Sequence, residues 1–136
     1  MNMLERRALQ LAVAAGSLVP IGAGGAGVFL GVRLADPSAI GSADLDSHFR
    51  YLSGLLLAIG LGFASTVPEI QARGRRFRLL TGIVVLGGAG RLFSILTIGV
   101  PSSVMVAALV MELAVTPALA IWQRRAERSR GEPAPR

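Results

Sequence analysis

Four long stretches of the chain carry almost no charge, and this pattern restricts the fold more than any other feature of the sequence. They cover residues 8–32, about 48–67, 79–99 and 102–122. An α-helix needs about 20 apolar residues to cross roughly 30 Å of hydrocarbon, and each stretch is close to that length or longer. Because lipid cannot hydrogen-bond the backbone, each stretch is expected to be helical. The sequence therefore predicts an all-α, polytopic membrane protein.

The composition agrees with a membrane protein and excludes several functions. Apolar residues make up 52% of the chain, charged residues make up 16%, and the mean hydropathy is +0.59. The absence of cysteine excludes disulfides, thiolate metal sites and a cysteine nucleophile. Although the net charge is +6, the arginines gather at the ends of the apolar stretches rather than on one aromatic-rich face, so we expect no nucleic-acid binding.

The loops and the arginines predict the topology. Residues 99–102 are too few for anything but a tight turn, so the last two helices are expected to be antiparallel neighbours in a four-helix transmembrane bundle. Arginines are concentrated near the N-terminus, in the second loop (73–78) and in the tail (124–136). The positive-inside rule places these segments, and both termini, on the cytoplasmic side of the cell membrane. The tail is expected to be disordered or to lie on the anionic leaflet.

The first apolar stretch contains a stripe of small residues and one proline. Its members recur at spacings of three and four residues, which places them on one helical face: Ser17, Pro20, Gly24, Gly27 and Gly31. Such a stripe is typical of a helix-packing surface, and a ligand groove is the alternative. Pro20 should kink the helix and free the carbonyl of Gly16, which Ser17 is placed to satisfy. A second alternative is that residues 1–27 form a cleaved signal peptide.

Glycines 22, 24, 25 and 27 have the spacing of a dinucleotide-binding loop, but the surroundings do not fit. That motif requires a preceding strand and a βαβ unit, and neither is expected here. We predict no cofactor.

Two ionisable residues interrupt the last two stretches, Arg91 and Glu112. Each lies about ten positions from the turn at Pro101 and Ser102, so at 1.5 Å per residue both are expected about 15 Å below the membrane surface, on adjacent helices. A charge at such depth is costly unless it is paired. We therefore expect the two side chains to pair. The pair either fixes helix register or forms a binding site in which Arg91 holds an anionic head group and Glu112 binds or relays a proton.

A polar collar precedes the second apolar stretch. Asp46 or Ser47 is expected to cap this helix, and Asp46 and Arg50 are four residues apart, as suits an ion pair. Tyr51 is typical of a membrane interface, where Arg50 can also snorkel outward. His48 is the only histidine and has no partner at ligand spacing, so we predict no metal site. Anchoring explains the collar, and binding by His48, Arg50 and Tyr51 is the alternative.

Three segments of this sequence carry a family resemblance. They are 48–54 (HFRYLSG), 90–94 (GRLFS) and 112–117 (ELAVTP). The chain resembles, from about Leu4 to Trp122, the bacterial family called domain of unknown function 4345. The resemblance implies a small four-span membrane protein and assigns no catalytic role to any residue.

Three functions fit these observations. The first is a membrane-embedded binding or accessory protein that holds a lipid or other amphipathic ligand near Arg91 and Glu112. The second is a small proton-coupled transporter, which would need a homodimer because four short helices enclose little volume. The third is a lipid-modifying enzyme that uses His48 or Glu112 as acid or base. The binding protein is the expectation, because the chain shows neither an internal repeat nor a catalytic motif.

Overall fold

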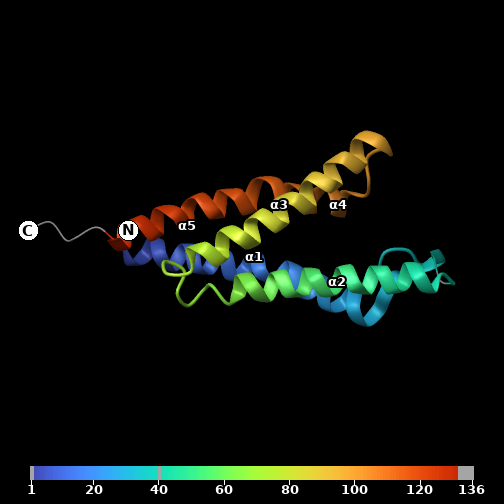
Figure 1. Ribbon diagram of the computed structural model, residues 1–136, viewed down its shortest axis with the longest axis horizontal. Helices are drawn as coiled ribbons and strands as arrows, with labels where there is room; N and C mark the ends of the chain where they lie inside the picture. The colour runs from blue at the N-terminus through green and yellow to red at the C-terminus, as the bar shows by residue number, and fades with distance from the viewer. Residues whose placement is uncertain (1, 40, 132–136) are drawn as a thin grey trace, which may run out of the picture. The chain divides into compact units, whose positions relative to one another are not determined.

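The computed structural model describes residues 2–39 and 41–131, and every regular element in these ranges is helical (Figure 1). The α-helices are α1 (Met3–Leu30), α2 (Ala43–Ala64), α3 (Gly74–Thr97), α4 (Ser103–Val110) and α5 (Thr116–Gly131). Between them lie η1 (Gly31–Leu34), η2 (Pro37–Ala39) and the π-helical turn η3 (Met111–Val115), which joins α4 to α5. The predicted all-α class is confirmed.

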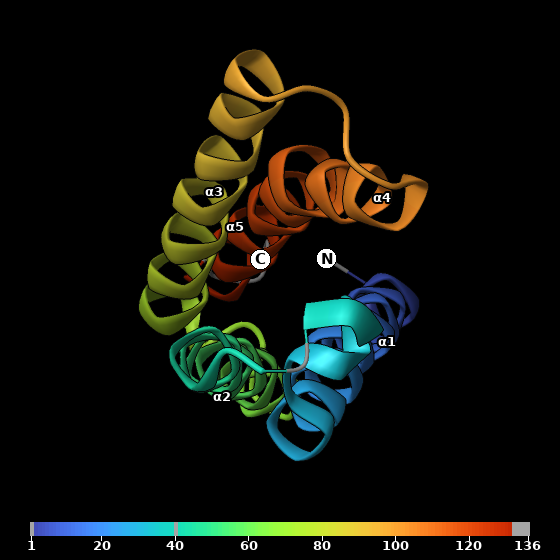
Figure 2. The ribbon, with the colours of Figure 1, turned by 90° about the vertical axis from the view of Figure 1, so that its right-hand side faces the viewer.

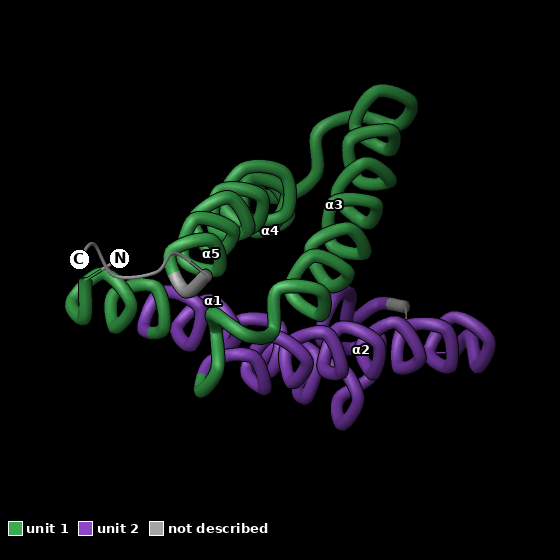
Figure 3. Tube along the Cα trace, turned by 60° about the vertical axis from the view of Figure 1, so that its left-hand side comes forward, with its two compact units in different colours: residues 1–10, 68–136 green, residues 11–67 purple. Residues whose placement is uncertain are grey.

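The chain divides into two compact units, coloured separately in Figure 3. Unit 1 comprises Met1–Gln10 and Pro68–Arg136, and unit 2 comprises Leu11–Val67. Unit 2 contains most of α1 together with α2, and unit 1 contains α3, α4, η3 and α5.

In unit 2, α1 and α2 lie side by side (Figures 1 and 2) and run antiparallel. A Cβ atom on Gly24 would meet the backbone of Ser53 and Leu57, and one on Gly27 would meet the Ser53 side chain. The predicted stripe of small residues is therefore a packing surface for α2. Ser17 is buried but donates to the carbonyl of Val13 at 2.7 Å, so it does not satisfy the Gly16 carbonyl as predicted.

In unit 1, α3 packs along η3 and α5, and Figures 1 and 2 show it diverging from α4 toward the loop at 98–102. Residues 68–73 of the loop before α3 are tied to α5 at the other end of this unit. Gln123 donates to the carbonyl of Ile70 at 2.9 Å, and Gln71 donates to the carbonyl of Ala126 at 3.2 Å. Phe77 is fully buried nearby on α3.

Three helical segments are long and apolar enough to cross a membrane: Met3–Leu34, Gly74–Thr97 and Ser103–Ser129. α2 does not reach this standard, although it has 22 residues, because its first two turns carry Asp44, Asp46, His48 and Arg50. The membrane character of the chain is supported, and three of the four predicted spans are reproduced as membrane-type helices.

The start of the tail is helical. The composition after Arg124 predicts a segment that is disordered or lies on the anionic leaflet, and the structure continues α5 to Gly131. Within these extra two turns, Glu127 forms an ion pair with Arg78 of α3. Residues 132–136 lie outside the described residues.

Large apolar side chains are exposed along these helices. Leu18, Phe29, Leu86, Leu96 and Val104 each expose at least two-thirds of their surface. In water so many exposed apolar groups would favour aggregation, whereas in a bilayer they contact lipid. The exposed side chains thus agree with the membrane-type composition of the helices.

Candidate functional site

Arg91 of α3 and Glu112 of η3 form the ion pair that their equal distances from the turn predict. The Nε of Arg91 donates to both carboxylate oxygens of Glu112, at 3.0 and 2.9 Å. Glu112 is the more buried partner, with 18% of its side chain exposed against 38% for Arg91. The pair lies between antiparallel helices of one unit, so its geometry rests on contacts within that unit.

The far edge of the Arg91 guanidinium is poorly satisfied. Its Nη1 lies 3.1 Å from the thioether sulfur of Met105, which is a weak acceptor. Within the described residues, no oxygen atom accepts a hydrogen bond from Nη1 or Nη2. Arg91 therefore offers the N–H donors of Nη1 and Nη2, which no described oxygen accepts.

Glu112 occupies a π-helical turn, and Pro117 explains why the turn forms. A proline lacks the amide hydrogen, and its ring would clash with the carbonyl four residues before it, here that of Leu113. Widening the helix by one residue relieves this clash, and Thr116 then donates its backbone N–H and its hydroxyl to the carbonyl of Met111, five residues back. Opposite this turn, a Cβ atom on Gly88 would meet Leu113 and Glu112. The glycine thus makes room for the turn that carries the carboxylate.

The Pro117→Ala variant tests whether the π turn positions Glu112. Alanine restores the missing N–H, so the segment is expected to return to α-helical geometry and to rotate Glu112 away from Arg91. Glu112→Ala should then destabilise the Pro117→Ala background less than it destabilises the wild type. Thermal unfolding of the four proteins in detergent measures this difference. If Glu112→Ala lowers the stability by the same amount in both backgrounds, the π turn does not position the pair.

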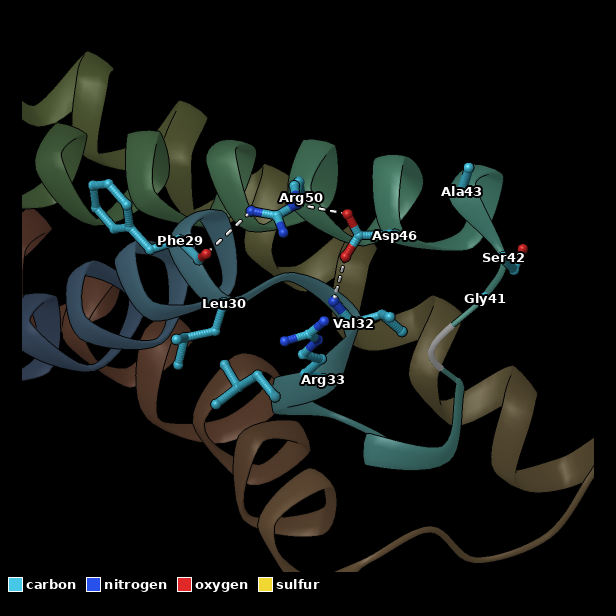
Figure 4. Close-up of a pocket in the computed structure, with 10 residues that line it drawn as sticks. Phe29, Leu30, Val32, Arg33, Gly41, Ser42, Ala43, Asp46 and Arg50 are labelled. Carbon is cyan, nitrogen blue, oxygen red and sulfur yellow. Dashed lines mark hydrogen bonds and ion pairs between the residues drawn. The ribbon is translucent and has the colours of Figure 1, made fainter.

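The collar residues Asp46 and Arg50 form the predicted ion pair, at 2.7 Å, and together they hold the C-terminal end of α1 (Figure 4). Arg50 Nη1 donates to the carbonyl of Val28 at 2.6 Å and to that of Phe29 at 3.2 Å. Asp46 accepts from the backbone N–H of Val32 at 2.9 Å. The pair therefore satisfies backbone groups that the end of a helix leaves unpaired.

Gly31 allows this close approach. Its φ of +65° suits glycine, and a Cβ atom there would collide with the Asp46 carboxylate and the Arg50 guanidinium. The predicted cap of α2 is wrong, because Ser42 is the N-cap residue and accepts from the backbone N–H of Leu45 at 3.2 Å. Asp46 instead lies inside the first turns of α2, where it reaches α1.

A recess of about 770 Å³ opens at this junction. Figure 4 shows the residues around it, which come from the end of α1, from η1 and from the start of α2. Arg50 lines it but is committed to Asp46 and to the carbonyls of α1. Arg33 also lines it and has no hydrogen bond to another described residue. The recess belongs to unit 2 and shares no lining residue with the Arg91–Glu112 pair of unit 1.

His48 and Tyr51 do not join Arg50 at the recess. Both side chains are exposed, and His48 follows Asp46 by two residues, which rotates it about 200° around the helix. The collar is therefore divided between a structural pair and two exposed side chains. His48 has no partner that would make a metal site, since the described residues contain no cluster of three histidine, cysteine or acidic side chains.

The Asp46 contacts predict a pH dependence of stability. The hydrogen bond from Arg50, and then that from the Val32 amide, lowers the pKa of Asp46 below its ordinary value of 3.8. A carboxylate with a lowered pKa stabilises the fold above its unfolded pKa, and this contribution is lost as the pH falls through the folded value. We expect the melting temperature to fall between about pH 5 and about pH 2. Asp46→Asn should reduce this fall, and an unchanged pH profile would contradict the role of Asp46.

These features define an all-α chain of membrane-type helices with an ion pair between two of them. The family model described as a domain of unknown function, number 4345, matches residues 8–123, so the chain belongs to this family. Both ion-pairing residues and the whole collar lie within the matched range. The comparisons found no matching curated protein and no matching solved structure.

Proposed function

We propose that the protein is a membrane-embedded binding or accessory protein that holds a lipid or other amphipathic ligand at Arg91 and Glu112. The observation that carries the proposal is the unsatisfied edge of the Arg91 guanidinium. Nε is occupied by Glu112, while Nη1 meets only the sulfur of Met105 and Nη2 meets no described acceptor. Unsatisfied N–H donors are costly in hydrocarbon, and an oxygen-rich head group would relieve that cost.

The chemistry of the pair suits recognition of a polar head group. Guanidinium nitrogens bind carboxylate, phosphate and carbonyl oxygens strongly, since the donor is charged. Glu112 neutralises the positive charge, so the site does not require a fully charged ligand. The apolar side chains exposed on α3, such as Leu96, would contact the hydrocarbon part of the ligand.

The proposal includes the four-span topology with both termini in the cytoplasm. α2 has 22 residues but falls short of the membrane-type standard, and its polar first turns satisfy the end of α1 through Arg50 and Asp46. In this topology the arginine-rich segment at 73–78, which includes the first turn of α3, faces the anionic cytoplasmic leaflet, as the positive-inside rule requires. The Arg91–Glu112 pair then lies near the middle of the membrane, about 15 Å below its outer surface.

Native mass spectrometry of the detergent-purified protein tests the proposed function. Wild type is expected to retain a defined small molecule or lipid, and the Arg91→Leu, Glu112→Leu double variant is expected to lose it. The double variant removes both charges together, so neither is left unpaired, and circular dichroism checks that it stays helical. Equal retention of the same molecule by both folded proteins would refute binding at this pair.

A further inference from the structure

A second cluster of charge lies at the opposite end of unit 1 from the loop at 98–102. A recess of about 330 Å³ is lined by Arg78 of α3 and by Arg124, Glu127 and Arg128 of α5. The lining of this hollow carries three cations and one anion, so its net charge is +2. None of these residues belongs to the Arg91–Glu112 site.

The single carboxylate of the recess is already engaged. Arg78 Nη1 donates to Glu127 at 2.7 Å. A Cβ atom on Gly74 would collide with the same carboxylate, so Glu127 lies against the first turn of α3. A helix N-terminus favours negative charge, and Arg78 adds an ion pair. Glu127 is therefore neutralised by α3 and its arginine.

Arg124 and Arg128 are left without an anionic partner. Neither forms a hydrogen bond or ion pair with another described residue, although Glu127 lies on the same face of α5. They are four residues apart, so the helix brings their like charges together, an arrangement that is destabilising by itself. An anion bound between them would remove this repulsion.

We propose that Arg124 and Arg128, with Arg78 beside them, bind the phosphate group of an anionic ligand. Guanidinium groups match phosphate oxygens with paired hydrogen bonds, and two of them neutralise a phosphate more fully than one. The site follows directly on the apolar part of the last membrane-type helix, at Trp122, which is a typical interfacial residue. Basic pockets at this level of a membrane helix suit the phosphodiester of an anionic lipid, and a free phosphate ion presents the same oxygens.

The test compares two double variants with the same loss of charge. Arg124→Gln with Arg128→Gln removes both free cations of the recess. Arg75→Gln with Arg125→Gln is the control, because both arginines are exposed and do not line the recess. Full-length proteins are titrated in detergent with phosphatidylglycerol, phosphatidylcholine and inorganic phosphate, and bound ligand is counted by native mass spectrometry.

We expect the recess variant to bind phosphatidylglycerol about tenfold more weakly than wild type, and the control to change little. Selective loss of phosphatidylglycerol would support a lipid phosphate, and selective loss of inorganic phosphate would support a free phosphate. If both double variants lose the same amount of ligand affinity, or if neither loses any, the proposed phosphate site is wrong. If the double glutamine variant does not fold, the Arg124→Gln and Arg128→Gln single variants replace it, each compared with Arg125→Gln, and the same comparison decides.

Discussion

Gly24→Ala is expected to separate α1 from α2. A Cβ atom at Gly24 would lie 2.5 Å from the backbone nitrogen of Leu57 and 2.7 Å from the carbonyl oxygen of Ser53. Backbone atoms inside a helix cannot move aside without shifting the whole helix, so the cost falls on the packing of the two helices. Overpacking of this kind costs about 1–3 kcal/mol of stability. Because the clash is with backbone atoms, we expect Gly24→Ala to cost close to the upper end of this range. Thermal unfolding in detergent measures the loss.

Gly25→Ala is the matched control for this substitution. It introduces the same methyl group one residue further along α1, where nothing lies within 4 Å of the added atom. Because alanine is a better helix former than glycine, by up to about 1 kcal/mol, this variant should be at least as stable as wild type. If the Gly24→Ala and Gly25→Ala variants have the same melting temperature, the glycine stripe is not the packing surface of α1.

Glu112→Ala is expected to cause the second large loss of stability. The variant leaves Arg91 charged on a membrane-type helix. It removes the carboxylate whose two oxygens accept hydrogen bonds from the Arg91 Nε at 2.9 and 3.0 Å. Removing one partner of a buried ion pair costs about 3–5 kcal/mol, and we expect about 3 kcal/mol because Arg91 is partly exposed. Unfolding in mixed micelles, followed by circular dichroism, gives this value.

The Arg91→Leu, Glu112→Leu double variant should recover most of that stability. Two apolar side chains of similar size pack between α3 and η3 and leave no charge in the hydrocarbon. A double variant that is less stable than Glu112→Ala would mean that the ion pair contributes net stability. A recovered double variant also provides the folded reference that the ligand-binding experiments require.

The sequence predicts the pairs whose geometry follows from spacing along helices. Arg91 and Glu112 lie at equal distances from a short turn, and Asp46 and Arg50 lie one helical turn apart, so their contacts need no knowledge of how other elements pack. The glycine stripe of α1 is predicted for the same reason. In each case the structure confirms the contact or the packing surface.

Three features of the structure were not predicted from the sequence, because they depend on where helices end, how they deform and how they pack. The cap on α1 requires that the helix stop at Leu30, and the signal was Gly31, since a glycine in the left-handed conformation commonly follows a helix. The π turn at Glu112 also had a signal, Pro117, in a stretch that looks uniformly helical. The contact of the tail's helical start with Arg78 of another helix had no local signal, because it depends on how the two helices pack.

Photocrosslinking from position 105 tests most directly whether Arg91 holds a ligand. Met105 contacts the Nη1 of Arg91, so replacing it with the photoreactive residue benzoylphenylalanine places the reactive group beside the guanidinium. After irradiation in native membranes, we expect one defined mass addition at position 105. The addition should be absent from the same protein carrying Arg91→Leu and Glu112→Leu, and from a protein labelled at the exposed neighbour Val104. Labelling at position 105 that persists without Arg91 and Glu112, or equal labelling at position 104, would contradict the binding site.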